Sequence, residues 1–523
     1  MARRSWVQPL TLSAIAGLLG FRPTKAELHA RAARNQYQRL RARYDAAQTT
    51  SDNSEHWLQA DDLSGTAANS LPVRRTLRRR ARYEVANNCY ASGMLLTIAN
   101  DLVGTGPRVQ MKTADTEANK KIEQEFARWC REVKLAPKLR TAVVTKKRDG
   151  EIFFRFFSNP SHESPVWLDV ELLEQDQVTT PTLVPTEFVI DGITFDQYQN
   201  PYSYQILRQH PGEQVAIRTW LPDNVPASQV IHWFRVDRPG QRRGVPEITP
   251  ALPLFAQLRR FTLSVITAAE TAADHAAVLE STAAANAEDT DGDIGALSPF
   301  DDVAYTRGML TAVPFGWKLS QLRAEQPTTT YGMFKQEILN EIARCIHVPY
   351  NVAAGNSAGY NYSSGRLDHK GYYGAIGIEQ SECELVVLDR IFRAWYAEAR
   401  LITLADGSRY VPDVDLCLHP YAWAWDPPAD IDPVKTATAQ SIGLANGTVT
   451  FAEIFGEKGV EMAVSLQEQA DALGITKEEY QALLRQKIFG AVLSQAPDPS
   501  VSARRKKKKR SWLPKRMFGG ARV

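Results

Sequence analysis

The chain has 523 residues, enough for about two to four domains and a sizeable buried core. Its content of 44% hydrophobic and 23% charged residues is that of a soluble globular protein, and no apolar run reaches the roughly 18–20 residues of a membrane helix. The formal net charge of +3 conceals ten Lys and Arg without any Asp or Glu over residues 504–522, so the rest of the chain carries −7.

Residues 1–72 form a polar N-terminal arm. Within it, residues 10–21 follow two arginines and imitate the apolar core of a signal peptide, but no small-x-small cleavage site follows cleanly. We therefore interpret them as a short amphipathic segment that leads into a basic helix over residues 25–43. The five scattered cysteines include no C-x-x-C pair, which favours free thiols in a reducing cytoplasm over disulfides or structural zinc.

Two helices are predicted next. The first covers residues 73–102, begins with a cluster of arginines and stops at Gly104 and Gly106. The second covers residues 116–133, where apolar side chains spaced 4, 3 and 4 apart form one face: Ile122, Phe126, Trp129 and Val133.

Residues 150–235 change character and predict a compact, mainly antiparallel β region between helical blocks. Asp191-Gly192 is typical of a hairpin turn. The predicted strands are separated by Pro, Gly and Asn, and they cover residues 151–157, 166–170, 188–190, 204–207, 215–220 and 230–236.

From residue 250 the chain becomes helical again, and alanine dominates residues 268–287. An acidic, turn-rich section follows, and then a helix with apolar residues four apart, ending at Val348-Pro349. Residues 354–366 predict a Gly/Ser/Asn/Tyr loop. A longer helix over residues 367–400 and a domain of short helices over residues 433–493 complete the prediction.

Recognisable catalytic patterns are absent from the sequence. It contains no Walker A loop, no G-x-S-x-G and no H-E-x-x-H, and Gly104-Thr105-Gly106 lacks the third glycine of a dinucleotide-binding turn. Asp289, Asp291 and Asp293 imitate a calcium loop but lack its glycine and its final glutamate. We therefore expect no catalytic residue, no metal and no cofactor.

Three separated stretches resemble the lambda-type family of phage portal proteins, in the family's order. The Arg-Pro-Gly-Gln-x-Arg-Gly string at Arg238–Gly244 is the most specific of the family's patterns. The others are Leu77–Arg82 with Asn87-Asn88 and Asn100–Gly106, the run from Asp191 to Tyr204, and Ile342–Arg344 with Val348–Tyr350 and later Asp432-Pro433. Tyr44–Ala47 and Trp57 add to the resemblance, which spans about residues 44–470.

The resemblance implies an α+β portal fold that assembles as a ring, normally of twelve subunits, without enzymatic activity. Mapped onto this sequence, it predicts a wing over residues 73–248, a stem helix over 249–285, a clip over 286–327 and a stem or wing helix over 328–353. It further implies a tunnel loop over 354–366, a wing helix and return over 367–432, a helical crown over 433–495 and a basic flexible tail over 496–523.

The tunnel loop is the predicted DNA-channel element, because small residues give it mobility and its polar side chains can touch phosphates without reading sequence. These side chains are Asn356, Tyr360, Asn361, Tyr362 and Arg366. An ordinary surface or interface loop is the alternative. An acidic body suits a channel wall that repels phosphates, since many phosphate contacts would produce adhesion.

Two further groups have predicted roles. A structural or interface turn is predicted for Arg238, Pro239, Gly240, Gln241, Arg243 and Gly244, and phosphate contact is its alternative. The arginines between Arg74 and Arg82 are interpreted as an ion-pair face, within the wing or between subunits. The basic tail is expected to bind polyanions such as packaged DNA, with a solubilising tail or a chance nuclear-localisation look-alike as the alternative. Its core is Arg504, Arg505, Lys506, Lys507, Lys508, Lys509 and Arg510.

The implied partners are further copies of the chain, double-stranded DNA without sequence specificity, terminase, the major capsid or scaffold protein, and head-completion or tail connector proteins. No membrane partner is expected. The implied location is the capsid vertex of a virion, after assembly in the host cytoplasm. Two other hypotheses stay open at this point: a phage-associated nuclease or protease with a cryptic carboxylate site, and a basic-tailed nucleic-acid-binding structural protein.

Overall fold

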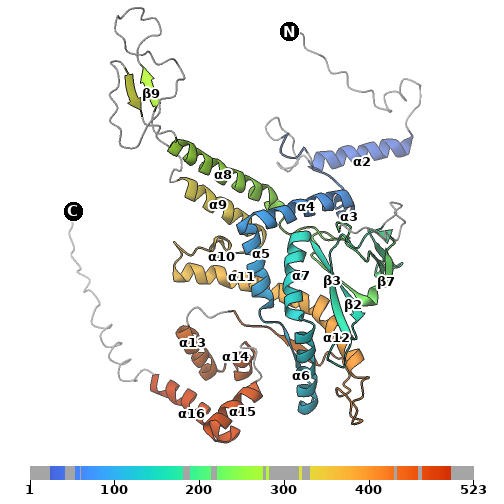
Figure 1. Ribbon diagram of the computed structural model, residues 1–523, viewed down its shortest axis with the longest axis vertical. Helices are drawn as coiled ribbons and strands as arrows, with labels where there is room; N and C mark the ends of the chain where they lie inside the picture. The colour runs from blue at the N-terminus through green and yellow to red at the C-terminus, as the bar shows by residue number, and fades with distance from the viewer. Residues whose placement is uncertain are drawn as a thin grey trace, which may run out of the picture. The chain divides into compact units, whose positions relative to one another are not determined.

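The computed structural model describes residues 24–41, 54–58, 60–180, 189–213, 221–274, 278–281, 317–320, 330–428, 433–457 and 462–495. The chain divides into two units, Met1–Ser64 and Gly65–Val523. In the first unit, α2 (Lys25–Arg41) confirms the predicted basic helix. The second unit holds the remaining elements (Figure 1).

The second unit begins with α3 (Gly65–Ala68), α4 (Leu71–Asn87) and α5 (Cys89–Val103). The prediction of one continuous helix over residues 73–102 is wrong, because Asn88 adopts an extended conformation at φ −122° and ψ 115°. Its side chain accepts hydrogen bonds from the backbone N–H groups of Tyr90 and Ala91, at 3.0 and 3.4 Å. Asn88 is thus an N-cap that starts a second helix.

Helices α6 (Thr116–Glu132) and α7 (Leu135–Asp149) follow β1 (Arg108–Met111). The predicted apolar face of α6 is confirmed, since Ile122, Phe126 and Trp129 are buried. This face joins the main core, where Phe126 packs against Phe392 and Trp395 with ring centroids 5.1 Å apart in each pair. Aromatic side chains of this size dominate core energetics.

The predicted antiparallel β region is confirmed and contains two sheets. In the first, β2 (Glu151–Ser158) lies between β3 (Leu168–Leu173) and β8 (Val230–Phe234). The second is formed in chain order by β4 (Val189–Ile190), β5 (Ile193–Phe195), β6 (Pro201–Ile206) and β7 (Asp223–Pro226). Asp191 and Gly192 connect β4 to β5 with φ of 47° and 84°, as the hairpin prediction requires. The strand predicted at 215–220 lies outside the described residues.

One 3-10 turn, Ala227–Gln229, connects β7 to β8, and another, Thr249–Ala251, leads into α8 (Leu252–Asp274). Figure 1 shows α8 side by side with α9 (Thr330–Cys345), and Phe261 stacks on Tyr331 between them. The strands β9 (Val278–Ser281) and β10 (Trp317–Ser320) pair antiparallel. The predicted helical character up to residue 285 is therefore wrong at β9. Most of the predicted clip, including Asp289–Asp293, lies outside the described residues.

After α9 come α10 (Tyr350–Ala354), α11 (Tyr362–Cys383), a π-helical turn (Glu384–Leu388) and α12 (Asp389–Ala399). The predicted helix over 367–400 is confirmed but begins five residues earlier. Strand β11 (Tyr421–Ala424) then returns to pair with β1.

The short helices predicted near the C-terminus are confirmed as α13 (Pro433–Asn446), α14 (Phe451–Glu457), α15 (Met462–Leu473) and α16 (Lys477–Gln495). Among the described residues, no helix combines the length and the apolar character that crossing a membrane requires. Helices and antiparallel sheets in one chain confirm the α+β class.

Candidate functional site

The predicted tunnel loop is shorter than expected, because α10 and α11 take up both of its ends. The connection runs over residues 355–361, all but Tyr360 exposed, and it contains positive φ at Gly355 (62°) and Gly359 (85°). Asn361 caps α11: its side chain accepts from the N–H of Ser364 at 2.8 Å, and the Ser364 hydroxyl accepts from the N–H of Asn361 at 3.3 Å. This capping box explains why the helix starts inside the predicted loop.

The five predicted DNA-contact residues consequently fall into different settings. Asn356 and Asn361 are exposed, but both side chains accept hydrogen bonds from nearby backbone N–H groups. Burial, followed by the nearby Asp368, raises the pKa of Tyr360, which is half-buried. Tyr362 is the first residue of α11, and Arg366 lies exposed one turn further on.

Lys370 is a basic residue on the face of Arg366 that the sequence prediction missed. It is exposed and follows Arg366 by four residues, so the two cations lie on one face of α11. No ion pair to either side chain is found within the described part of the chain. Continuing the i, i+4 spacing past the end of the loop would have identified it.

The turn Arg238–Gly244 directs its polar groups inward. Gln241 is 5% exposed, and its side-chain oxygen accepts from the N–H groups of Asp237 and Arg238, at 3.0 and 3.2 Å. Its side-chain nitrogen donates to the carbonyl of Arg243 at 2.9 Å. One buried amide therefore fixes the turn on both sides, while Pro239 and Gly240 are exposed at its tip.

Arg243 is 4% exposed and pairs with Glu151 on β2, at 2.8 and 3.0 Å. It also donates to the carbonyls of Val178 and Asp191. A guanidinium with so many partners inside the subunit is not available for phosphate contact. This contradicts the phosphate alternative for Arg243, whereas an interface role for the exposed tip of the turn stays a prediction.

Gly244 lies against the backbone of the residue before β2. A Cβ at this position would lie 2.6 Å from the carbonyl carbon of Gly150 and 2.9 Å from the Cβ of Glu151. Real Cβ atoms do not approach backbone this closely, so the position requires glycine. At Gly240 the space is open, and the requirement is a φ of 77°.

Glu151 is the centre of a buried charge cluster that also contains Arg74, Arg243 and His232. Arg74 lies 3.6 Å from the Glu151 carboxylate and His232 lies 2.8 Å from it. Burial alone would raise the pKa of Glu151, but Arg243, His232 and Arg74 outweigh it and hold this pKa well below its usual value. Burial, aided by Arg243, lowers the pKa of Arg74 to about 10.

The arginines of α4 divide into two stripes. Arg74, Arg78 and Arg82, four residues apart, face the β region and pair with acidic side chains of the same subunit. The remaining arginines of the cluster are exposed and have no ion-pair partner among the described residues: Arg75, Arg79 and Arg80. The ion-pair face predicted within the wing is confirmed for the first stripe.

One acidic cluster has the spacing of a metal site. Ligand atoms of Glu174, Asp176 and His210 lie within 4.8 Å of one another. However, Arg82 lies 2.7 Å from Glu174 and 3.0 Å from Asp176, and Arg78 also pairs with Asp176. Since guanidinium groups already neutralise both carboxylates, a cation would have to displace them, and the geometry is that of an ion-pair network.

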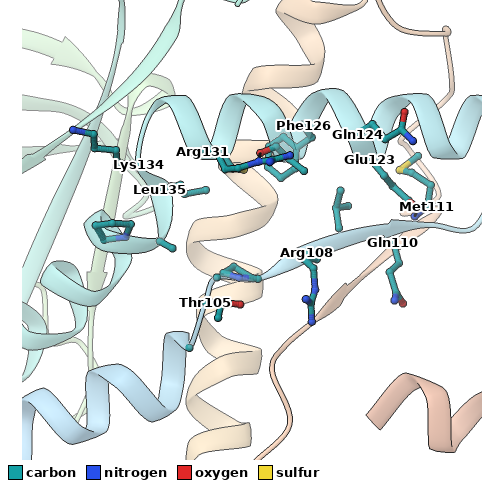
Figure 2. A pocket seen from close by; sticks show the side chains of 18 of the residues that line it. Thr105, Arg108, Gln110, Met111, Glu123, Gln124, Phe126, Arg131, Lys134 and Leu135 are labelled. Atoms are coloured by element: carbon teal, nitrogen blue, oxygen red, sulfur yellow. Dashed lines mark hydrogen bonds between the residues drawn. The ribbon is translucent and has the colours of Figure 1, made fainter. Parts of the chain in front are cut away.

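A groove of about 1200 Å³ lies where the α5–β1 turn meets β1, α6 and α7. Figure 2 shows its apolar floor at Met111, Phe126 and Leu135 and basic side chains such as Arg131 and Lys134 around it. Cys130 also lines it, and burial raises the pKa of this thiol.

The Gly104-Thr105-Gly106 turn beside this groove has a structural role. Asp426 accepts from the N–H of Thr105 at 2.6 Å and pairs with Arg108 at 3.2 Å. The turn therefore holds the segment that follows β11. The basic tail, Arg504–Arg510, lies outside the described residues.

Comparisons with known proteins agree with the sequence patterns. Residues 50–376 match the family described as phage portal protein, lambda family. A protein of Halomonas phage phiHAP-1, named a probable portal protein, is 24% identical over 419 residues, which cover 73% of this chain and 77% of that protein.

Among solved structures, a chain in the neck of an empty GTA particle computed with C6 symmetry has a TM-score of 0.39 at 14% identity, covering 74% of this chain and 93% of that one. The corresponding values for the neck of the native GTA particle computed with C12 symmetry are 0.39 and 14%, with 75% and 94% covered. The family match covers more than half of the sequence and overturns the enzyme alternative, and the chain therefore belongs to the lambda family of phage portal proteins, which are structural and not enzymatic.

Proposed function

We propose that about twelve copies of this portal subunit close a ring at one vertex of a phage or prophage capsid and form a channel for double-stranded DNA. The observation that carries this proposal is the portal-family match over residues 50–376. In this role the subunit is assembled in the host cytoplasm and becomes part of the virion. It contacts capsid or scaffold protein, binds terminase during packaging, and later binds head-completion or tail proteins.

We further propose that DNA passes the loop over residues 355–361 and the basic pair Arg366 and Lys370. Two cations four residues apart on one helix repel each other, and a phosphate backbone beside them would relieve that repulsion. Few such contacts per subunit guide DNA without holding it, and an acidic body of −7 limits adhesion elsewhere. The basic tail would add a polyanion contact outside the channel wall.

The ring is tested by measuring the native mass of the purified full chain. About 0.7 MDa is expected from about twelve copies of 58.4 kDa. A chain that stays monomeric at every concentration contradicts the proposed function.

The DNA contact is tested in an in vitro packaging reaction with rings carrying Arg366→Ala and Lys370→Ala. The matched control is Arg75→Ala with Arg79→Ala, which also removes two exposed basic residues four apart, but on α4. Both variants should form rings, and only the α11 variant should package less DNA. Equal packaging by the two variants contradicts the assignment of this channel element.

A further inference from the structure

Helix α11 has one face bound to its own subunit and one face in solvent. On the bound face, the Tyr372 hydroxyl donates to Asp101 at 2.7 Å and the Gln380 amide donates to the carbonyl of Leu102 at 3.0 Å. Lys147 of α7 donates to Glu379 at 2.7 Å. These contacts with α5 and α7 fix which side of α11 points outward.

The outward side carries a regular apolar row that we name the outer seam: Leu367, Gly371, Gly374 and Ile378. Their spacing of 4, 3 and 4 places them on one stripe of the helix, and all four are exposed. Leu367 is 72% exposed and Ile378 is 74% exposed. Two large apolar side chains are thus largely exposed on one stripe of a single helix.

The two glycines of the seam destabilise α11, and no packing contact inside the subunit requires them. Glycine is among the least favourable residues in a helix interior. A Cβ at Gly371 or Gly374 would have no described atom of this chain within 4 Å, so neither glycine is required by local packing. Both φ values are those of an ordinary helix, because neither residue is among the glycines with positive φ. What glycine does provide on a helix face is close approach of another element.

We propose that the outer seam packs against a second copy of this chain, in the contact between neighbouring subunits of the ring; this inference rests on the proposed ring. The two glycines lack side chains and lie between Leu367 and Ile378 along the seam, so they would admit bulky apolar side chains of a neighbour. The same chain exposes such side chains on α8 and α9, where Leu263, Met333 and Phe334 are 59%, 60% and 46% exposed.

A ring needs two different surfaces on each subunit, one for each neighbour. The seam, with two glycines at its centre, and the α8–α9 pair, with large exposed side chains, are two such surfaces of complementary shape. DNA is a poorer occupant, because the seam offers no cation to a phosphate. The cations Arg366 and Lys370 lie on the flank of the seam, so one helix can face both the channel and a neighbour.

The test compares Gly371→Ala with Gly374→Ala, combined in one full-length chain, against Gly93→Ala. Gly93 is a matched control, since it is an exposed glycine within α5 with open space around it. All these changes should raise the thermal midpoint of the unassembled chain, because alanine favours helix. The seam variant alone should raise the subunit concentration for half-assembly by about tenfold or more, since two methyl groups would overpack a close contact.

Ile378→Lys provides a second variant that adds a charge to the seam without touching the core. It should also impair assembly while leaving the thermal midpoint of the unassembled chain unchanged. If wild type and both seam variants assemble at the same concentration, the seam is not an interface, but the proposed ring is not contradicted. If those variants assemble normally but package less DNA, the seam faces the channel and the inference is overturned. If wild type never assembles, the proposed ring fails and the seam with it.

Discussion

The substitution Glu151→Gln tests the buried charge cluster most directly. Glu151 is fully buried, accepts hydrogen bonds from Arg243, and lies within ion-pair distance of Arg74 and His232. The amide keeps the size and one acceptor oxygen, but it presents N–H groups to two buried guanidinium groups and leaves Arg243 without its carboxylate partner. Removing one partner of a buried ion pair costs about 3–5 kcal/mol. Since Arg74 retains Asp191, we expect a loss of about 3 kcal/mol, the lower end of that range.

Asp223→Asn supplies the control, because Asp223 and Arg208 form an exposed pair with the same chemistry in the same β region. Arg208 is 71% exposed, and its two donors lie 2.9 to 3.1 Å from the Asp223 carboxylate. Such pairs contribute about 0.2–1 kcal/mol. The assay measures the free energy of unfolding of the unassembled chain in urea, with tryptophan fluorescence and circular dichroism as the two signals. Equal losses for the two variants would refute the reasoning that burial makes Glu151 costly to replace.

Three further outcomes are expected. Gly244→Ala should abolish folding of the β region, because its cost in stability exceeds the ~1–3 kcal/mol of ordinary overpacking. Gly240→Ala should cost about 1–2 kcal/mol of stability, through the positive φ alone. Expression yield and thermal midpoint distinguish the two variants. Burial raises the pKa of Glu247, but its lysine partners lower it from 4.5 to about 2, so its stabilisation is complete above 4.5 and is lost as pH falls toward 2. Glu247→Gln should therefore flatten the acid limb of an unfolding curve. Finally, a thiol reagent should modify exposed Cys89 well before Cys130 in the folded, unassembled chain, and at equal rates after denaturation.

Local signals predicted the regular elements well. Apolar spacing identified α6, and Asp191-Gly192 identified the β4–β5 hairpin. The errors arose where a single side chain decides a boundary. Asn88 is an N-cap that splits one predicted helix in two, and Asn361 is an N-cap that starts α11 within the predicted loop. Amino-acid composition alone does not reveal where such a cap lies. Both asparagines precede helical sequence, so a search for N-caps would have placed them.

The predicted sites were harder to place because their contacts are distant in sequence. Arg243 pairs with a carboxylate 92 residues earlier, and nothing near it in the chain indicates that partner. The interior stripe of α4 has the same difficulty, since charged side chains do not follow the hydropathy pattern that marks a buried face. The family resemblance identified Arg238–Gly244 as important, but only the fold shows that Arg243 is internal.

This internal charge framework also fixes the position of α11, which begins where the loop over residues 355–361 ends. Lys147 is 1% exposed and joins α7 to α11 through Glu379, while it also pairs with Glu247 directly after the Arg238–Gly244 turn. The loop over residues 355–361 enters α11 at the opposite end of that helix from Glu379. A rigid helix transmits its anchoring over its whole length, so the residues near the loop keep their orientation although the loop itself makes few contacts. If DNA passes this loop as proposed, Glu379→Gln, which removes the charge that pairs with Lys147, should reduce the DNA packaged in the in vitro reaction without any change in the loop's own sequence.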